Sequence, residues 1–265
     1  AKEPVLSGGR YDNLLKDFGC DFPAIGFAIN IDQIAAAVLD SCENVKQKEE
    51  DSKLRIALTK GRLEKDAIAL FERMGFDCSH LYDKGRRLFL TIPGQNIDIV
   101  FGKAADVITY VEHGVCDMGV VGMDTIMEQG GSFYEVLDLG FGQCRFVLAA
   151  LKGRDFYSGY SIKKVATKYP QITRDYFEEK GMDVQIIKIE GSVELAPLLS
   201  LADGIVDLVE TGKTLSENGL AIVNEIRRIS ARLIVNETSM KLKKEDIDTF
   251  INNMTEKVEN NICNQ

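Results

Sequence analysis

Two spacings of hydrophobic residues alternate along the chain from residue 54 onward. Short apolar runs rich in β-branched residues predict buried strands, and apolar residues three or four positions apart predict helices. Residues 54–59 (LRIALT) are typical of a strand, and Leu63 to Met74 have helical spacing until Gly75. The alternation predicts an α/β fold in which helices cover parallel sheets.

The same alternation continues to the end of the chain. Further strands are expected at 88–92, 97–101, 117–121, 145–150, 163–167, 184–189, 205–209 and 230–235. Helices are expected at 105–113, 124–129, 171–180 and 192–201, and a last amphipathic helix has the apolar face Ile247, Phe250, Ile251, Met254, Val258 and Ile262. Pro-Gly-Gln-Asn after residue 92 predicts a hairpin. The strands form two successive series, and the last strand and helix return to the first series. This order predicts two lobes and a ligand-binding cleft.

The first fifth of the chain has a different pattern. Residues 40–53 (DSCENVKQKEEDSK) are highly charged and contain few large apolar groups, which predicts an exposed linker. The glycine-punctuated residues 1–39 before it are too short to bury a core of their own. We therefore expect a short N-terminal extension ahead of the two lobes.

The stretch 204–220 carries the most specific chemical pattern. A strand that contains Asp207 ends in residues 210–214 (ETGKT), before a helix-like segment. Gly212 lets the backbone approach a ligand closely, and the Thr211 and Thr214 hydroxyls add donors, as in a phosphate-binding loop. A P-loop is excluded, because that motif needs a glycine where this chain has Asp207. A polar turn without a ligand is the alternative.

Basic residues follow several of the expected strands. Lys60 and Arg62 come after strand 54–59, Arg86 precedes strand 88–92, and Lys103 follows strand 97–101. Arginine can bind a phosphate with a bidentate fork and lysine as a point charge. Solvated surface turns are the alternative for each. In a chain of formal net charge -9, basic groups at strand ends favour an anionic ligand.

Other polar positions have simpler interpretations. Ser192 is expected to cap the helix that follows it, with ligand contact as the alternative. Asp124 is expected to cap its helix or, as the alternative, to line the cleft. His80 and His113 stand alone, without the spacing of a metal site or a catalytic pair.

Composition excludes several classes of protein. The negative net charge argues against a nucleic-acid-binding surface. No apolar run approaches the ~18 residues of a membrane span. The six cysteines form no CxxC pair, so we expect reduced thiols and a cytoplasmic protein. No basic and apolar leader follows Ala1, and nothing in the sequence indicates secretion.

Five segments together resemble one family. They are LRIALTKGR at 54–62, AADVITYVEHG at 104–114, DMGVVG at 117–122, GSVELAP at 191–197 and DLVETGKTL at 207–215. With them, the chain from residue 54 to its end is similar to ATP phosphoribosyltransferases, the first enzymes of histidine biosynthesis. The family usually has arginine at the position of Lys103. The missing C-terminal regulatory domain indicates the short form of the family.

This resemblance implies a fold like that of type II periplasmic binding proteins. Lobe I would comprise 54–142 and 223–265, and lobe II 143–222. The implied ligands are ATP, 5-phosphoribosyl pyrophosphate (PRPP) and Mg²⁺, with no direct metal site in the protein. Implied PRPP-binding residues are Asp207, Glu210, Thr211, Gly212, Lys213 and Thr214, with Mg²⁺ near Asp207 and Glu210. Implied catalytic residues are Lys60, Arg62 and Arg86, and secondary or ATP-binding positions are Lys103, Asp124 and Ser192.

Residues 1–39 resemble a second family. Gly8-Gly9-Arg10-Tyr11-Asp12 and Gly26-Phe27-Ala28-Ile29 are similar to the C-terminal part of the catalytic core of histidyl-tRNA synthetases. Asp32-Gln33 stands where a synthetase has an ATP-binding arginine, which favours the non-catalytic regulatory subunit of ATP phosphoribosyltransferase. A fusion truncated at its start, a misassembled reading frame and an extension without a role all remain open. The short form implies a hetero-oligomer with that subunit and a homodimer of catalytic chains.

Three functions are compatible with these observations. The first is transfer of the phosphoribosyl group from PRPP to N1 of the ATP adenine, with release of pyrophosphate. The second is a two-lobed module that binds a small anion without catalysis. The third is a phosphoribosyltransferase that acts on a free base.

Overall fold

The computed structural model describes residues 6–11, 24–29 and 53–262. Residues 1–52 and 53–265 form two separate units. In the first unit, β1 (Leu6–Tyr11) pairs antiparallel with β2 (Ala24–Ile29). The predictions for 12–23 and 30–39, for the linker up to residue 52 and for the thiols of Cys20, Cys42 and Cys263 lie outside the described residues.

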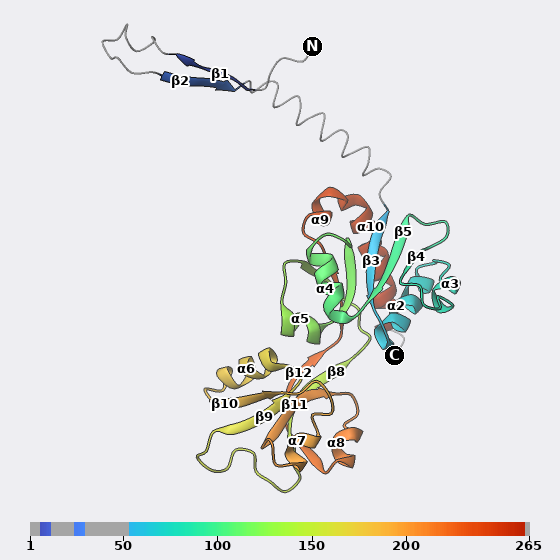
Figure 1. The fold of residues 1–265 in the computed structure, drawn as a ribbon. Coiled ribbons are helices and arrows are strands. Elements are labelled where there is room, and N and C mark those ends of the chain that lie inside the picture. The colour runs from blue at the N-terminus through green and yellow to red at the C-terminus, as the bar shows by residue number, and fades with distance from the viewer. Residues whose placement is uncertain (1–5, 12–23, 30–52, 263–265) are drawn as a thin grey trace. The chain divides into compact units, whose positions relative to one another are not determined.

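The second unit contains two mixed sheets, which Figure 1 shows one above the other. The six-stranded sheet has the order β4 (Phe89–Thr91), β5 (Ile97–Gly102), β3 (Leu54–Thr59), β6 (Met118–Gly122), β13 (Ala231–Val235) and β7 (Tyr134–Asp138). Its helices are α2 (Arg62–Arg73), α3 (Ser79–Tyr82), α4 (Ala104–Glu112), α5 (Met123–Gln129), α9 (Ser239–Leu242) and α10 (Lys244–Ile262). We call this assembly lobe I.

The five-stranded sheet and its helices form lobe II. Its strands have the order β10 (Val184–Lys188), β9 (Lys163–Thr167), β11 (Gly204–Val209), β8 (Cys144–Leu151) and β12 (Leu220–Ile229). Its helices are α6 (Pro170–Glu179), α7 (Leu195–Leu198) and α8 (Lys213–Glu217). The chain enters this sheet after β7 and leaves it before β13. The predicted division of the lobes at residues 142–143 and 222–223 stays a prediction.

The prediction of parallel sheets is wrong in part. Strand β8 runs antiparallel to both β11 and β12, and β13 runs antiparallel to both β6 and β7. The antiparallel pairs arise where the chain passes between the lobes for the second time. Strand β12 leads out of lobe II beside the incoming β8, and β13 then runs back along β6. Of the other pairs in the two sheets, β3/β5, β3/β6, β9/β10 and β9/β11 are parallel, and β4/β5 is antiparallel.

The helical periodicities predict buried faces that the structure confirms. In α2, Ala67, Leu70 and Phe71 are buried. In α10, the buried residues of the expected face are Ile247, Phe250, Met254 and Val258, while Ile251 is partly buried and the side chain of Ile262 lies outside the described residues. The predicted hairpin is also present, since β4 pairs antiparallel with β5. Each of these faces packs into the core of lobe I.

A buried polar network anchors the C-terminal helices to the lobe I sheet. Asp117 is buried, with 5% of the residue exposed. It accepts hydrogen bonds from the Arg55 backbone N–H at 2.8 Å, the Ser239 hydroxyl at 2.7 Å and the Lys243 ammonium at 3.0 Å. Because a buried charge needs all its partners, this network fixes the start of α9 and α10 against β3.

A Ser239→Ala substitution tests this anchor. Losing one hydrogen bond to a charged group should lower the free energy of unfolding by about 1.5–3 kcal/mol. Chemical denaturation monitored by circular dichroism measures the loss. The exposed Ser161→Ala is the control and should change stability by less than about 0.5 kcal/mol. Equal stability of the two variants would contradict the anchoring role.

Candidate functional site

The chain makes a tight turn directly after β11. Gly212 has φ 80° and ψ 4°, a left-handed conformation that glycine adopts without strain. The Thr211 hydroxyl accepts the Lys213 N–H at 3.4 Å, and the side chains of Thr211 and Thr214 are exposed. Residues 210–214, which we call the 210–214 loop, therefore present hydroxyls and amides at the carboxyl end of a sheet strand. Open α/β sheets bind their ligands at such ends.

A pocket of about 290 Å³ lies beside the 210–214 loop. Its lining residues are Glu194, Asp207, Leu208, Val209, Glu210, Thr211, Gly212, Lys213, Thr214 and Leu215. The structure thus brings all six residues that the resemblance implied for PRPP to one cavity. Three of the lining side chains are carboxylates, so the pocket suits a ligand with hydroxyl groups or one that arrives with a cation.

The Asp207 carboxyl has an unusual ionisation behaviour. Burial, and to a lesser degree the nearby Glu194, raise its pKa to about 6 against the opposing effects of the Leu208 N–H and Lys168. A carboxylate that is costly to ionise in this pocket is stabilised by any ligand that donates hydrogen bonds to it. Such a ligand would therefore favour the ionised form of Asp207.

Sequence reasoning missed two residues around Asp207. Glu194 lies within the GSVELAP segment, but only Ser192 of that segment was proposed. Lys168 directly follows β9, and the parallel pairing of Thr167 with Val206 places it beside Asp207. The position of Lys168 after a strand was the available signal, and it is the same signal that singled out Lys60 and Lys103.

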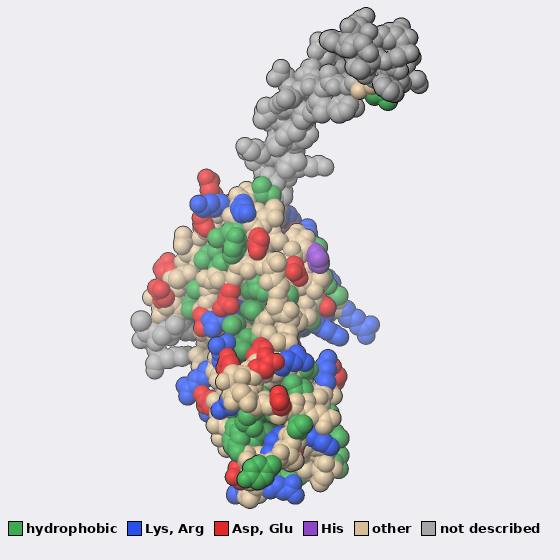
Figure 2. All heavy atoms as spheres, turned by 90° about the vertical axis from the view of Figure 1, so that its left-hand side faces the viewer, with side chains coloured by type: hydrophobic (Ala, Val, Ile, Leu, Met, Phe, Trp, Pro, Cys, Tyr) green, Lys and Arg blue, Asp and Glu red, His purple; other side chains and the backbone are tan. Residues whose placement is uncertain are grey.

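The two lobes meet at an ion pair between proposed site residues. The Arg62 guanidinium at the start of α2 contacts the Glu210 carboxylate in the 210–214 loop. Their side chains are 49% and 57% exposed, so both are accessible to a ligand. Figure 2 shows acidic and basic side chains side by side at the waist between the lobes. The pair links residues that are 148 positions apart in sequence.

The other basic residues remain exposed. The Lys60 N–H donates to the Gly102 carbonyl at 2.9 Å, which holds the ends of β3 and β5 together. Lys103 is the N-terminal residue before α4, and Arg86 lies in the turn before β4. Within residues 53–262, Lys60, Arg86 and Lys103 form no ion pair with another side chain. Their charges are thus available to an anion.

The prediction that Asp124 caps α5 is wrong. The N-cap position belongs to Gly122, and Asp124 lies in the first turn. Its carboxylate folds back so closely that a Cβ on Gly122 would lie 2.1 Å from Asp124 Oδ1. Burial raises the pKa of Asp124, and a hydrogen bond with Tyr169 of lobe II opposes this rise. The side chain faces the other lobe.

The prediction of a helix over 192–201 capped by Ser192 is wrong as well. Helix α7 covers a single turn, Leu195–Leu198, and its N-cap residue is Glu194. It ends because Ser200 adopts a left-handed φ of 57° and the Leu201 N–H donates back to the Ala196 carbonyl at 2.9 Å. Ser192 is exposed before this turn.

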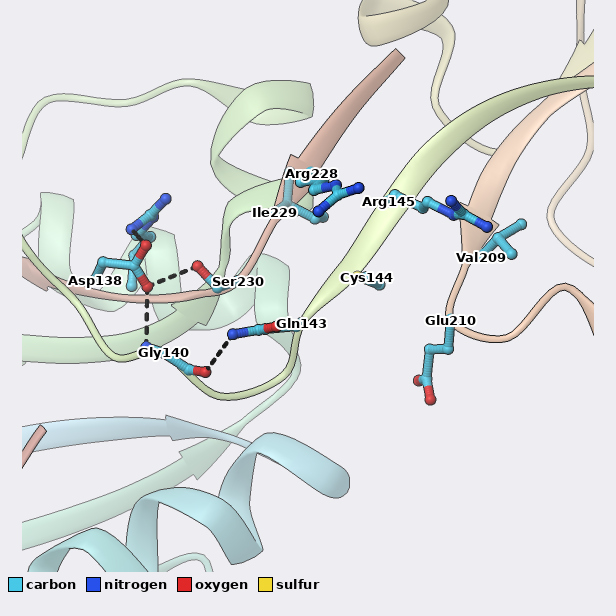
Figure 3. A pocket seen from close by; sticks show the side chains of 11 residues that line it. Asp138, Gly140, Gln143, Cys144, Arg145, Val209, Glu210, Arg228, Ile229 and Ser230 are labelled. Carbon is cyan, nitrogen blue, oxygen red and sulfur yellow. Dashed lines mark hydrogen bonds and ion pairs between the residues drawn. The ribbon is translucent and has the colours of Figure 1, made fainter. Parts of the chain in front are cut away.

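A second pocket of about 770 Å³ lies where the strands pass between the lobes. Figure 3 shows Asp138, Ser230, Gly140 and Gln143 joined by hydrogen bonds along its wall. Its lining residues are Asp138, Gly140, Gln143, Cys144, Arg145, Val209, Glu210, Arg228, Ile229, Ser230 and Arg232. Val209 and Glu210 also line the smaller pocket, so the two cavities adjoin.

Two kinds of feature are absent from the described part of the chain. No helix among its residues is long and apolar enough to cross a membrane. No three His, Cys, Asp or Glu side chains among them lie together as a metal site.

Fold and site together define a class. Two α/β lobes connected by two passages of the chain, with the pocket beside the 210–214 loop at a strand end, are the architecture of a two-lobed ligand-binding protein. The periplasmic aliphatic sulphonate binding protein SsuA of Escherichia coli has a similar fold, with a TM-score of 0.51, 12% identity, and coverage of 78% of this chain and 72% of that one. The predicted periplasmic-binding-protein-like fold is thus confirmed.

Comparison of sequences then identifies the family. Residues 103–256 match the family model "HisG: ATP phosphoribosyltransferase". The ATP phosphoribosyltransferase of Clostridium kluyveri is 62% identical over 202 residues, 76% of this chain and 92% of that protein. The Clostridium acetobutylicum enzyme is 58% identical over 206 residues, 78% and 96% of the two chains. The chain belongs to the ATP phosphoribosyltransferase family, as its motifs predicted.

A solved complex and a second family model complete the comparison. A chain of the ATP phosphoribosyl transferase (HisG:HisZ) complex from Thermotoga maritima superimposes with a TM-score of 0.67 at 36% identity, covering 78% of this chain and 99% of that one. Residues 1–34 match the histidyl-tRNA synthetase family, which confirms the second resemblance. The enzyme is a pentosyltransferase that transfers the phosphoribosyl group of PRPP to ATP in histidine biosynthesis.

Proposed function

We propose that the pocket beside the 210–214 loop holds PRPP. The Thr211 and Thr214 hydroxyls, the amides around Gly212 and the Lys213 ammonium would bind the 5-phosphate. Asp207 and Glu210 would accept hydrogen bonds from the ribose hydroxyls. The support is geometric, since all these groups line one cavity at a strand end.

ATP and the departing pyrophosphate are assigned to the facing lobe. Lys60, Arg62 and Arg86 carry positive charge at or near strand ends of lobe I, and Arg62 already contacts Glu210. This ion pair is the observation that carries the assignment, because it brings a lobe I cation to the edge of the PRPP pocket. When the diphosphate group of PRPP binds, it would replace Glu210 as the partner of the Arg62 guanidinium.

The chemistry requires positioning more than proton transfer. The adenine N1 is a neutral nucleophile that attacks C1 of PRPP as the bond to pyrophosphate breaks, so no base has to deprotonate it first. Cations near the leaving group stabilise the charge that develops there. Mg²⁺ would supply part of this charge as a complex with PRPP, and the oxygen ligands of Asp207 and Glu210 fit a hydrated Mg²⁺.

Secondary roles are proposed for the residues around this centre. Lys103 and Ser192 would contact ATP or the ribose from the rim of the site. Asp124 would contribute through its hydrogen bond with Tyr169. Lys168 is an additional candidate, because it lies beside Asp207 and would balance the carboxylates of the pocket.

Assembly and location are proposed from membership of the family. The chain would work in the cytoplasm as a dimer of catalytic chains that binds a synthetase-like regulatory subunit, and the similar Thermotoga maritima chain belongs to a HisG:HisZ complex. The division into residues 1–39, a linker at 40–53, lobe I at 54–142 and 223–265, and lobe II at 143–222 is retained as part of the proposal.

Turnover tests the phosphoribosyl transfer reaction directly. Pyrophosphate release is measured with ATP, PRPP and Mg²⁺, with and without the regulatory subunit. We expect pyrophosphate in stoichiometric amounts with phosphoribosyl-ATP. Replacing ATP by adenine should give none, and product from adenine would instead support action on a free base. Binding of PRPP without any turnover would support a binding module.

The leaving-group role of Arg86 gives a separate prediction. Arg86→Ala should lower kcat by about tenfold, while the KM for PRPP changes by less than about threefold, because the cation acts mainly on charge that develops in the transition state. The neighbouring Arg87→Ala serves as the control. A larger change in KM than in kcat would remove Arg86 from this role.

A further inference from the structure

Helix α5 of lobe I supplies a carboxylate to the start of α6 in lobe II. The Glu128 side chain accepts the Gln171 backbone N–H at 3.0 and 3.1 Å with its two oxygens. One of these oxygens also accepts the Ile172 N–H at 3.2 Å. These bonds join residues 43 and 44 positions apart and connect the two lobes. Figure 1 shows α5 above α6 and to its right.

Helix α6 lacks a cap from its own segment. Its N-cap residue, Tyr169, makes no side-chain capping bond, Pro170 begins the helix, and its first turn contains no acidic residue. The free N–H groups and the positive end of a ten-residue helix favour a negative partner. Glu128 is that partner, so a residue of lobe I completes a helix of lobe II.

Apolar packing surrounds this polar contact. Met123 and Met127 of α5 pack against the core of lobe II that contains Phe146 and Ile172. Asp124 on the same helix forms a hydrogen bond with Tyr169. One short helix of lobe I thus reaches lobe II through a cap, a side-chain hydrogen bond and two methionines. We call this contact the α5–α6 joint.

The joint is coupled to the PRPP pocket through the end of β9. The Thr167 hydroxyl donates to the Val206 carbonyl at 2.7 Å and accepts the Tyr169 N–H at 2.9 Å. The beginning of α6 is therefore tied to β11 one residue before Asp207. A shift of α6 relative to α5 would move Asp207 and the 210–214 loop relative to lobe I.

We propose that Glu128 is a positioning residue for phosphoribosyl transfer. Through the α5–α6 joint it holds lobe II in the orientation in which the 210–214 loop faces Arg62. Glu128 itself touches neither substrate. The proposal rests on the proposed function, in which lobe II holds PRPP and lobe I holds ATP and the leaving group.

A kinetic split tests the proposal in the complete chain with its regulatory subunit. Glu128→Ala and Glu128→Gln should lower kcat by about tenfold, because a small misalignment of two reactants is costly. The KM for PRPP should stay within about twofold, since the groups proposed to bind its 5-phosphate and ribose belong to lobe II. Glu178→Gln, at the exposed far end of α6, is the matched control and should match the wild type in both constants. Unchanged kcat in both Glu128 variants, or an increase of KM alone, would overturn the proposal.

Amide hydrogen exchange tests the joint independently of turnover. In Glu128→Ala, exchange at Gln171 and Ile172 should accelerate by about tenfold, and Glu178→Gln should leave it unchanged. Unaltered protection of these two amides would also overturn the proposal. A wild type that releases no pyrophosphate would contradict the proposed function, and the exchange result would still decide on the joint.

Discussion

Asp207→Asn is expected to lower kcat/KM for PRPP by about 10²- to 10³-fold while it stabilises the fold at pH 8. A carboxylate that accepts hydrogen bonds from the ribose, or that faces hydrated Mg²⁺, contributes several kcal/mol to binding and alignment. The amide keeps the shape but loses the charge. Steady-state kinetics with varied PRPP measures the loss, and the exposed Asp183→Asn is the control.

The stability gain has a defined pH dependence. The pKa of Asp207 in the folded protein is about 6, above the ordinary aspartate value of 3.8. Ionising the buried carboxyl therefore costs stability, and the wild type becomes less stable as the pH rises through about 6. Removing the charge should recover about 2 kcal/mol at pH 8 and nothing below pH 4. Chemical denaturation at both values tests this, and equal gains at pH 4 and pH 8 would exclude the charge as the cause.

The same ionisation predicts how activity depends on pH. If PRPP binds to the ionised form of Asp207, kcat/KM for PRPP should fall about tenfold for each pH unit below 6. In Asp207→Asn this decline should be absent. A decline of equal size in the variant would assign it to another group.

The double substitution Thr211→Val/Thr214→Val is expected to raise the KM for PRPP by about 10²-fold or more. Each hydroxyl would donate to a phosphate oxygen, and a hydrogen bond to a charged group contributes about 1.5–3 kcal/mol. Valine keeps the branched shape, so the loop conformation set by Gly212 should persist. Thr249→Val on α10, far along the chain from the loop, is the control. A KM for PRPP equal to that of the control would remove both hydroxyls from the phosphate site.

Local features of the sequence predicted the fold and the loop. The helical faces of α2 and α10 and the 210–214 loop depend on neighbours within a few residues, so their patterns survive in a single sequence. Strand β12 was missed because two bulges, at Ile222/Asn224 and Glu225/Arg227, interrupt its alternation. Helix α7 was overestimated because the left-handed Ser200 ends it after one turn.

Contacts between distant segments could not be predicted in this way. The ion pair of Arg62 with Glu210 and the cap that Glu128 supplies to α6 depend on how two lobes face each other. The role of Lys168 depends on the register of β9 against β11. Asp124 was assigned to its own helix because sequence spacing shows only local partners, whereas its actual partner Tyr169 belongs to the other lobe. Residues that join the lobes are therefore the part of the site that requires the structure.

The end of β11 is proposed to hold the 5-phosphate of PRPP. A crystal structure of the chain with Mg²⁺ and PRPP tests it most directly. We predict the 5-phosphate within hydrogen-bond distance of the Thr211 and Thr214 hydroxyls, with the ribose against Asp207. A phosphate bound instead among Arg145, Arg228 and Arg232 of the larger pocket, with the 210–214 loop empty, would contradict it.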